Sequence, residues 1–552
     1  MNQTCKACNT AFDITELDQR FLDKFEVPPP THCPSCRHRR RLAFNNELNL
    51  YWRTCDKTGD KILSNISPEK SHVVYKPQVW WGDKWDALEY GRDFDFNRPF
   101  FEQFHELSRS VPHVSVQNNY LLDENAEYTN YAGSSKNCYL IFHADFNRDC
   151  YYGYGVKKCE SCVDVAYVFD SELLYECIDC RNCYNVRFSQ NCLNCSDSNF
   201  LRDCIGCKNC FGCKNLHQKE YYIFNVQHSR QDYERIVRDF GLTSRNNIIK
   251  LEQRFIEFCR SLPHRYLRTI QTENSFGDQL FNCRDVTESF DVADMRDGRY
   301  CYQIYNGAHD CMDMYQFGLG AELVYEGSII GYNCHFIRFC HMCNEQVADL
   351  TYCQDCYHAH DLFGCFGLRH KSFCILNQQY SEHEYHELRE RLISHMKKTG
   401  EWGEFFPMSI SPFAYNETTA FDYFPVTRAE ALKSGLKWKD DLDSDTVASE
   451  LASVPDDITN VTPEILKQSF RCEVSGKSYR IIQPELAFYQ KQGIPPPRRC
   501  FRERHDARRL RKNPRQLRHA QCDKCKKNIV TSYQEQPRVS IFCESCYQGA
   551  FI

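Results

Sequence analysis

Four pairs of cysteines have the spacing of metal-binding turns. In each pair two residues separate the cysteines: Cys5 and Cys8, Cys33 and Cys36, Cys522 and Cys525, Cys543 and Cys546. This spacing lets both thiolates of a tight turn reach one ion, and two such turns complete a tetrahedron. The sequence therefore predicts two zinc sites, one near each end. Four cysteines leave no open coordination position, so both sites are expected to be structural.

The two ends of the chain are copies of each other. A shift of 467 residues superimposes Cys5 on Cys472, and Cys55 on Cys522, without a gap. Each copy has room for two ribbons in tandem, but the copies have lost opposite halves. The first C-terminal ribbon and the second N-terminal ribbon carry replacements at cysteine positions, namely Ser475 and Glu503 in the former and Thr58, Lys76 and Val79 in the latter. One complete ribbon is expected at each end.

The middle of the chain contains a second duplication, offset by about 150 residues. Cys162-Val-Asp-Val matches Cys311-Met-Asp-Met, and Glu172-Leu-Leu-Tyr-Glu matches Glu322-Leu-Val-Tyr-Glu. From Cys138 to Cys213 every cysteine number is a multiple of three, mostly in steps of 12 and 15. Short repeats of this length suit a β-solenoid, in which each turn stacks equivalent side chains on the last. We therefore expect a mainly β fold with helices (α+β), in which terminal zinc ribbons flank two cysteine-laddered β-solenoid lobes.

Helices are expected at both ends of each lobe. Residues 99–110, 231–240, 244–262 and 382–397 have the composition or spacing of helices, and Ser381 followed by Glu384 forms a capping box. The predicted domains are residues 1–82, 83–243, 244–400, 401–467 and 468–552. These are, in order, the first ribbon unit, the two lobes, an aromatic segment with an acidic linker, and the basic second ribbon unit.

The central cysteines allow two interpretations. Cys204, Cys207, Cys210 and Cys213 form a run that could hold an additional metal. Bacterial iron–sulfur runs end instead with three intervening residues and a proline. The second lobe has Ala359 and Leu362 near the places of Cys207 and Cys210. Such exchanges favour packing, because buried thiols behave as small hydrophobes.

Basic residues gather beside the second cysteine turn, or its relic, at each end. From Phe470 to Ile552 there are 18 Lys and Arg against 7 Asp and Glu, although the whole chain has a net charge of −6. Arginine suits phosphate recognition, so these residues are candidates for binding nucleic acid. The alternative is that they pair with the acidic linker or lobes. The candidates are Arg37, Arg39, Arg40, Arg41, Arg498, Arg499, Arg502, Arg504, Arg508, Arg509, Arg511, Lys512, Arg515 and Arg518.

Composition limits the class of protein. The chain has 552 residues, of which 42% are hydrophobic and 35 are cysteine. The N-terminus lacks the basic and apolar regions of an export signal, and no apolar run is long enough for a membrane span. We therefore expect a cytoplasmic protein with reduced cysteines. No phosphate-loop, dinucleotide-binding or H-E-x-x-H motif occurs, so neither an enzyme nor catalytic residues are expected.

The N-terminal pattern resembles a short zinc-ribbon domain that is common in bacteria. It consists of Cys5-x2-Cys8, a stretch with Phe21 and Phe25, three prolines and Cys33-Pro-Ser-Cys-Arg-His-Arg-Arg-Arg. Together with Val79-Trp-Trp-Gly-Asp-Lys-Trp-Asp and the closing ribbon, the chain resembles large, uncharacterised cysteine-rich zinc-ribbon proteins of candidate-phyla-radiation bacteria (Patescibacteria). The resemblance implies zinc at the first tetrad and implies no reaction.

Three functions are compatible with these features. The first is a zinc-stabilised, non-catalytic protein that binds RNA or the ribosome through its basic ends. The second is a scaffold whose lobes bind protein while the basic ends make internal contacts. The third is a metal or iron–sulfur redox protein that uses the central cysteines. No small-molecule substrate and no membrane contact are expected.

Overall fold

The chain folds as a mixture of helices and parallel sheets that divides into two compact units. The computed structural model describes residues 1–305, 307–316, 320–322, 324–329, 331, 334–342, 346–440, 453–535 and 539–551. Unit 1 comprises residues 1–115 and 267–440, and unit 2 comprises residues 116–266 and 441–552. Each unit thus combines one terminal segment with the half of the central repeat that is remote from it in sequence. Most of the predicted acidic linker, residues 441–452, lies outside the described residues.

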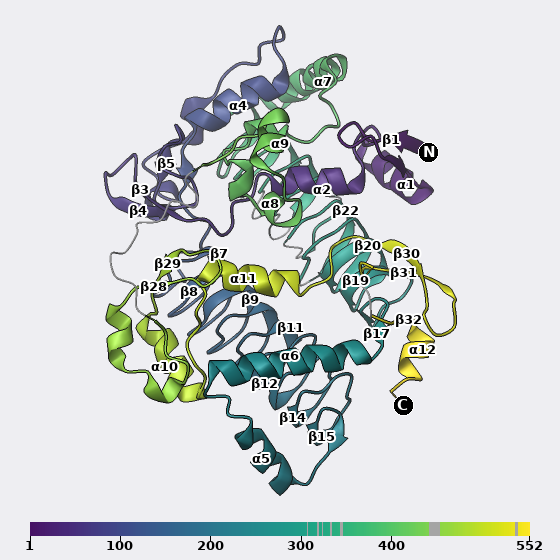
Figure 1. Cartoon of the computed structure of the whole chain (residues 1–552). Helices are drawn as coiled ribbons and strands as arrows, with labels where there is room; N and C mark the ends of the chain where they lie inside the picture. The colour runs from purple at the N-terminus through teal and green to yellow at the C-terminus, as the bar shows by residue number, and fades with distance from the viewer. Residues whose placement is uncertain are drawn as a thin grey trace. The chain divides into compact units, whose positions relative to one another are not determined.

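Unit 2 contains a long stack of parallel strands, here called ladder 1 (Figure 1). Neighbouring strands pair in parallel at a step of 12 residues, for example Ala166 with Ile178 and Tyr184 with Ser196, and no helix intervenes. An antiparallel hairpin closes the stack. Its strands are β7 (Asn130–Gly133), β8 (Tyr139–Asp145), β9 (Tyr151–Lys157), β10 (Ala166–Phe169), β11 (Ile178–Arg181), β12 (Tyr184–Arg187), β13 (Ser196–Asn199), β14 (Lys208–Phe211), β15 (Glu220–Ile223) and β16 (Val226–Gln227).

A three-residue period builds ladder 1. From Tyr131 to Phe224 every third residue has φ between +46° and +67°, including three glycines. The residue that follows each of these points inward, and the inward residues form one apolar core of Cys, Val, Ile, Leu and Ala. A left-handed residue in every triad turns the chain, and Asn and Asp tolerate this conformation best among residues with a side chain. This period explains why the cysteine numbers are multiples of three.

The cysteines of ladder 1 fill its interior and use their thiols as weak hydrogen-bond donors. The Cys177 Sγ lies 3.2 Å from the carbonyl oxygen of Val186, nine residues on and therefore on the next level of the stack. The Cys207 Sγ makes the same contact with Leu216 at 3.2 Å. Both side chains are almost completely buried. Each thiol thus fills space and partly satisfies a buried carbonyl group.

Unit 1 contains the equivalent stack, ladder 2. Its strands step by 12 or 13 residues, as in the pairs Ala348–His360 and Cys334–Val347. The extra residues shift the phase, so its inward cysteines are no longer multiples of three. The strands are β18 (Thr269–Ile270), β19 (Phe276–Phe281), β20 (Arg284–Ala293), β21 (Met295–Arg299), β22 (Ala308–Met312), β23 (Cys334–Arg338), β24 (Val347–Thr351), β25 (His360–Phe363), β26 (Ser372–Ile375) and β27 (Gln378–Gln379).

Helices border the ladders where the sequence predicts them. In unit 2 these are α5 (Arg230–Asp239) and α6 (Arg245–Ser261). In unit 1 they are α4 (Phe100–Ser110) and α7 (Glu382–Thr399). The Ser381–Glu384 capping box at the start of α7 is confirmed. No helix among the described residues is long and apolar enough to cross a bilayer.

Short parallel pairs join the ribbon modules to the segments that precede the ladders. In unit 1, β5 (Val74–Tyr75) pairs with β6 (His113–Val114). In unit 2, β32 (Ile541–Phe542) pairs with β17 (His264–Arg265). The two pairs correspond under both duplications, since Val74 matches Ile541 and His113 matches His264. The segment before ladder 1 therefore belongs to unit 1, and the segment before ladder 2 belongs to unit 2.

Candidate metal centres and docked arginine helices

The N-terminal cysteines converge on one point. Cys5 and Cys8 lie in the turn between β1 (Asn2–Thr4) and β2 (Ala11–Asp13). Cys33 caps the N-terminus of α2 (Pro34–Leu42), and Cys36 lies in its first turn. All four sulfurs lie within 4.8 Å of one another, and those of Cys8 and Cys33 are 3.8 Å apart. A Zn–S bond of about 2.3 Å in a tetrahedron places sulfurs roughly 3.8 Å apart, so the tetrad fits one such ion.

The C-terminal tetrad repeats this construction with other elements. Cys522 and Cys525 lie between β30 (Arg518–Gln521) and β31 (Asn528–Thr531), while Cys543 caps α12 (Glu544–Gln548) and Cys546 lies within it. The Cys525 and Cys543 sulfurs are 3.7 Å apart. Hydrogen bonding from Ser545, followed by that from the Cys546 backbone, lowers the pKa of Cys543 to about 6. Thiolates are the form in which cysteines bind a metal, so both tetrads can hold a metal ion.

The relic ribbons keep their turns without their full ligand sets. The backbone N–H of Lys76 donates to the Cys55 sulfur at 3.4 Å, as that of Cys543 donates to the Cys522 sulfur at 3.3 Å. The Ser475 hydroxyl lies 3.7 Å from the Cys500 sulfur. Within the described residues, neither relic appears among the groups that could hold a metal.

Cys204, Cys207, Cys210 and Cys213 lie in the interior of ladder 1. All four are buried, and each thiol contacts the carbonyl oxygen two residues before it and another nine residues after it. Their sulfurs do not form a metal-binding group in the part of the chain that the structure describes. The packing interpretation accounts for these contacts directly.

Replacement of Cys207 by alanine tests that interpretation. Ala359 stands at the equivalent place in ladder 2, so Cys207→Ala is expected to fold, to lose about 1 kcal/mol from a small cavity, and to leave the metal content unchanged. Urea unfolding and elemental analysis measure the two effects. A drop in bound metal in this variant would contradict the packing role.

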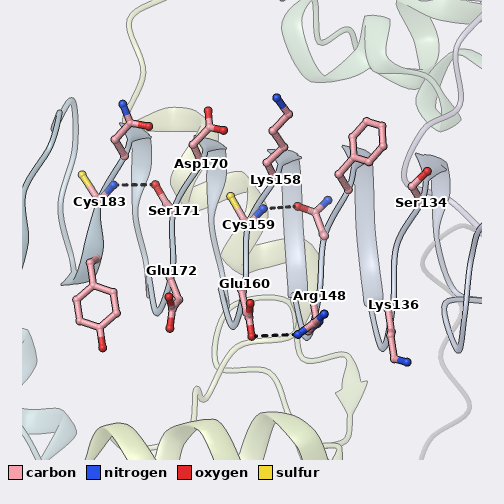
Figure 2. A pocket seen from close by; sticks show the side chains of 14 residues that line it. Ser134, Lys136, Arg148, Lys158, Cys159, Glu160, Asp170, Ser171, Glu172 and Cys183 are labelled. Atoms are coloured by element: carbon pink, nitrogen blue, oxygen red, sulfur yellow. Dashed lines mark hydrogen bonds and ion pairs between the residues drawn. The ribbon is translucent and has the colours of Figure 1, made fainter.

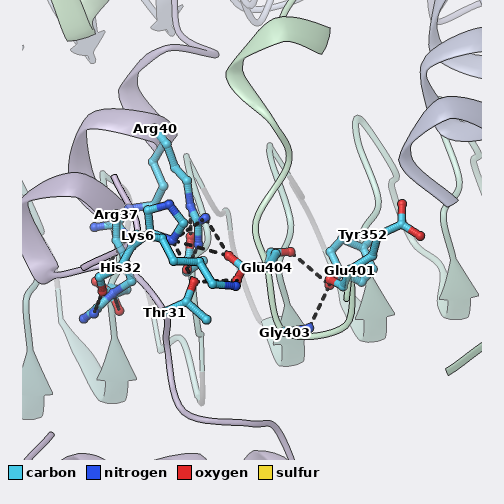
Figure 3. A network of polar contacts seen from close by, with 12 residues as sticks. Lys6, Thr31, His32, Arg37, Arg40, Tyr352, Glu401, Gly403 and Glu404 are labelled. Atoms are coloured by element: carbon cyan, nitrogen blue, oxygen red, sulfur yellow. Dashed lines mark hydrogen bonds and ion pairs between the residues drawn. The ribbon is translucent and has the colours of Figure 1, made fainter. Parts of the chain in front are cut away.

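The arginines of α2 are buried against ladder 2. Arg37 Nε lies 2.7 Å from Asp313 Oδ2, and Arg41 Nη1 lies 3.1 Å from Asp313 Oδ1. Arg40 contacts Glu326 and, at 2.9 Å, Glu404 (Figure 3). Burial would lower the pKa of Arg37, but the charge of Asp313 outweighs this and raises it above its ordinary value. These guanidiniums are therefore charged, paired internally and shielded from water.

The arginines of α11 (Phe501–Leu510) make the same arrangement on ladder 1. Arg504 and Arg508 both contact Asp164, the latter at 3.0 Å. Glu176 accepts from Arg508 at 3.2 Å and from Arg511 at 2.7 Å. By the duplications, Arg504 and Arg508 correspond to Arg37 and Arg41, and Asp164 corresponds to Asp313. We call each buried set of arginines and carboxylates an arginine anchor.

The other basic candidates are half-buried and also have internal partners. The Arg39 guanidinium lies over the Tyr415 ring, and Arg502 pairs with Asp506 at 2.9 Å. Similar contacts join Arg498 to Glu473, Lys512 to Asp179, Arg509 to Asp506, Arg515 to Tyr167 and Arg518 to the carbonyl group of Tyr533. Arg499 is also half-buried. The structure thus brings most predicted basic residues together on the ladders, and their placement favours the internal-pairing alternative.

The carboxylates of the arginine anchors were not predicted as partners of these arginines. Both duplicated sequences contained the signal, since Asp164 and Asp313 are the acids of Cys-Val-Asp-Val and Cys-Met-Asp-Met. A charged residue kept beside two inward apolar positions in both copies indicates a buried partner.

Glu485 is a buried acid beside the unit 2 anchor. It lies in α10 (Gln483–Gln492), is 1% exposed, and its Oε2 has no hydrogen-bond partner among the described residues. Burial raises its pKa to about 8, against the opposing influence of Arg504. The matching residue in unit 1, Asp18, instead pairs with Arg299 at 3.2 Å.

Unit 2 is therefore expected to lose stability as pH rises towards 8. The folded state retains a proton on Glu485 that the unfolded chain releases above its ordinary pKa of 4.5. Between these values the free energy of unfolding falls with pH, by on the order of 4 kcal/mol at pH 8. Glu485→Gln should remove this slope, as measured by urea unfolding between pH 5 and 8. An equal slope in the variant would show that another group titrates.

No family model, curated protein or solved structure matches this chain.

Proposed function

We propose that this chain is a zinc-stabilised, non-catalytic binding protein made of two related units. In each unit a four-cysteine zinc ribbon and its relic are docked by an arginine anchor onto a β-solenoid lobe, which ladders 1 and 2 represent. The geometry of the tetrads supports zinc, because sulfurs 3.7–3.8 Å apart suit tetrahedral Zn–S bonds. The constant parallel step and single inward core support the solenoid. The resemblance to Patescibacterial zinc-ribbon proteins belongs to the same proposal.

Within this class we favour a scaffold that binds protein through its solenoid lobes. The observation that carries this choice is the pair of arginine anchors. Arg37 and Arg41 in unit 1, and Arg504 and Arg508 in unit 2, are at most 5% exposed and are paired with carboxylates. A phosphate would have to displace those carboxylates and desolvate itself, at a large cost in free energy. The arginines hold the ribbons on the lobes, and the lobes remain to bind a partner.

Binding of RNA or the ribosome is the alternative that an experiment must separate. Purified full-length protein is titrated with labelled single-stranded RNA at several salt concentrations. A scaffold of this kind should bind weakly and with a shallow salt dependence, because few guanidiniums are available to release counterions. Tight binding with a steep salt slope, reduced by Arg498→Glu and Arg502→Glu but not by Lys208→Glu, would establish the RNA-binding function instead.

The redox alternative is separated by the absorption spectrum and metal content. Iron–sulfur clusters absorb in the visible range, whereas structural zinc is colourless. Broad visible absorption with stoichiometric iron would favour the redox function over the scaffold.

A further inference from the structure

Ladder 1 carries a groove that runs across its strands. The groove has a volume of about 820 Å³, within the range of ligand-binding sites, and all of its lining residues belong to residues 134–184 of the ladder itself. Five consecutive levels of the stack contribute one triad each. At roughly 4.8 Å per level the groove is about 19 Å long, which matches about six residues of an extended peptide.

The floor of the groove is internally satisfied. It is formed by inward residues, among which the Asn147 side chain accepts from the Cys159 N–H at 3.0 Å and the Ser171 hydroxyl accepts from the Cys183 N–H at 3.0 Å (Figure 2). These groups offer little to a ligand. Recognition must therefore come from the two rows of side chains that form the walls.

Charge is distributed unevenly along these walls. Lys136, Arg148 and Lys158 occupy the first three levels, and Glu160, Asp170 and Glu172 occupy the third and fourth. Their side chains are exposed. Only loose surface pairs link some of them, such as Arg148 with Glu160 at 3.8 Å. The groove thus has a basic end and an acidic end and carries no net charge.

Exposed aromatic rings stand towards the ends of the groove. Phe146, on the second level, is 58% exposed, and Tyr184, on the fifth, is 47% exposed. Large exposed rings supply contact area at low entropic cost and are enriched in protein interfaces. The corresponding positions of ladder 2 hold Arg284, Arg296, His309 and Glu322 in place of Lys136, Arg148, Glu160 and Glu172, so the acidic end is particular to ladder 1.

We propose that this groove binds an extended peptide segment of a partner protein that carries acidic residues at one end and basic residues at the other. The inference rests on the proposed scaffold function and names its binding site. Charge complementarity selects this occupant, because three carboxylates among three cations would repel the phosphates of a nucleic acid. Apolar side chains between the charged blocks of the peptide would lie against Phe146 and Tyr184.

Two labelled twelve-residue peptides of identical composition test the proposal by fluorescence anisotropy with the full chain. In the block peptide three Asp precede three Lys, with Leu and Ser between them; in the control peptide Asp and Lys alternate. The block peptide is expected to bind at least about tenfold tighter at low salt, as a few complementary surface pairs would provide. Equal affinity for both peptides, or binding of neither, would overturn the proposal.

Charge-reversal variants place the binding in the groove. Lys136→Glu with Lys158→Glu, or Asp170→Lys with Glu172→Lys, should each lose most of the affinity for the block peptide. All four changes together should restore it, because the reversed groove accepts the peptide in the opposite direction. Lys208→Glu, exposed in the same row but outside the groove, is the matched control. Unchanged affinity in both double variants would overturn the proposal.

The groove and the scaffold function can fail separately. Binding of neutral oligosaccharides or RNA in the groove, abolished by the same variants while the block peptide does not bind, would overturn the peptide inference alone. Steep salt-dependent RNA binding through the basic ends would overturn the scaffold function, whatever the peptides do.

Discussion

Asp164→Asn and Asp313→Asn should each destabilise their own unit by about 3–5 kcal/mol, the cost of leaving buried charges without their partner. Asp164 and Asp313 are fully buried, and each neutralises two arginines that are themselves at most 5% exposed. Asparagine keeps the shape of the side chain and tolerates the left-handed backbone at these positions, where φ is 56° and 60°. The change therefore removes charge and little else.

Hydrogen exchange resolved by peptide, combined with urea unfolding, assigns the loss to a unit. Asp170→Asn and Asp297→Asn are the matched controls, because both residues are exposed and have the same left-handed backbone. Both controls should change stability little. A double-mutant cycle of Asp164→Asn with Arg504→Met should show strong coupling. If Asp164→Asn behaved like Asp170→Asn, the arginine anchors would not hold the ribbons on the ladders.

Cys5→Ser and Cys522→Ser should each remove one zinc ion and unfold the ribbon to which it belongs. Structural zinc sites contribute apparent binding free energies of about 10–16 kcal/mol, more than a small ribbon can replace by packing. For Cys522→Ser, lost protection should extend from the turn between β30 and β31 to β17, because β32 pairs with β17 next to Cys543. The inward core of ladder 1 should remain protected.

The relic ribbons provide matched controls for this experiment. Cys55→Ser and Cys472→Ser alter equivalent turns that lack a full ligand set. They should leave the metal content unchanged and cost far less stability. Loss of protection in unit 1 on mutation of Cys522 would contradict the division into two separately stabilised units.

The metal centres could be predicted from sequence because their ligands are local. Two residues between cysteines and a helix cap at the second turn determine the geometry of each half-site, and only one closure brings the halves together. The relic ribbons are visible by the same rule, since Ser475 and Lys76 break it. The identity of the ion is not encoded by the spacing alone.

The central repeat could be predicted only in part. Multiples of three correctly indicated an inward position in each triad, but the cysteine steps of 12 and 15 concealed a constant level of 12 residues in ladder 1. Cysteines occupy several inward columns, so a step of 15 is one level plus one triad. In ladder 2 the inserted residues of the 13-residue levels hide the period altogether.

The pairing of each ribbon with its ladder could not be read from sequence. Arg504 and Asp164 are 340 residues apart, and a run of arginines has the same composition whether it meets phosphate or a buried carboxylate. The choice depends on tertiary contacts, in which each terminal module joins the remote half of the central repeat. Only the acids that recur in both halves hinted at it.

Elemental analysis with native mass spectrometry of the full chain, purified without added metal, tests the central claim most directly. The account predicts two zinc ions per chain, and one each in Cys5→Ser and in Cys522→Ser, with no change in Cys207→Ala. Four or more metal ions per chain, iron in place of zinc, or loss of both ions from a single substitution would contradict two independent structural zinc sites.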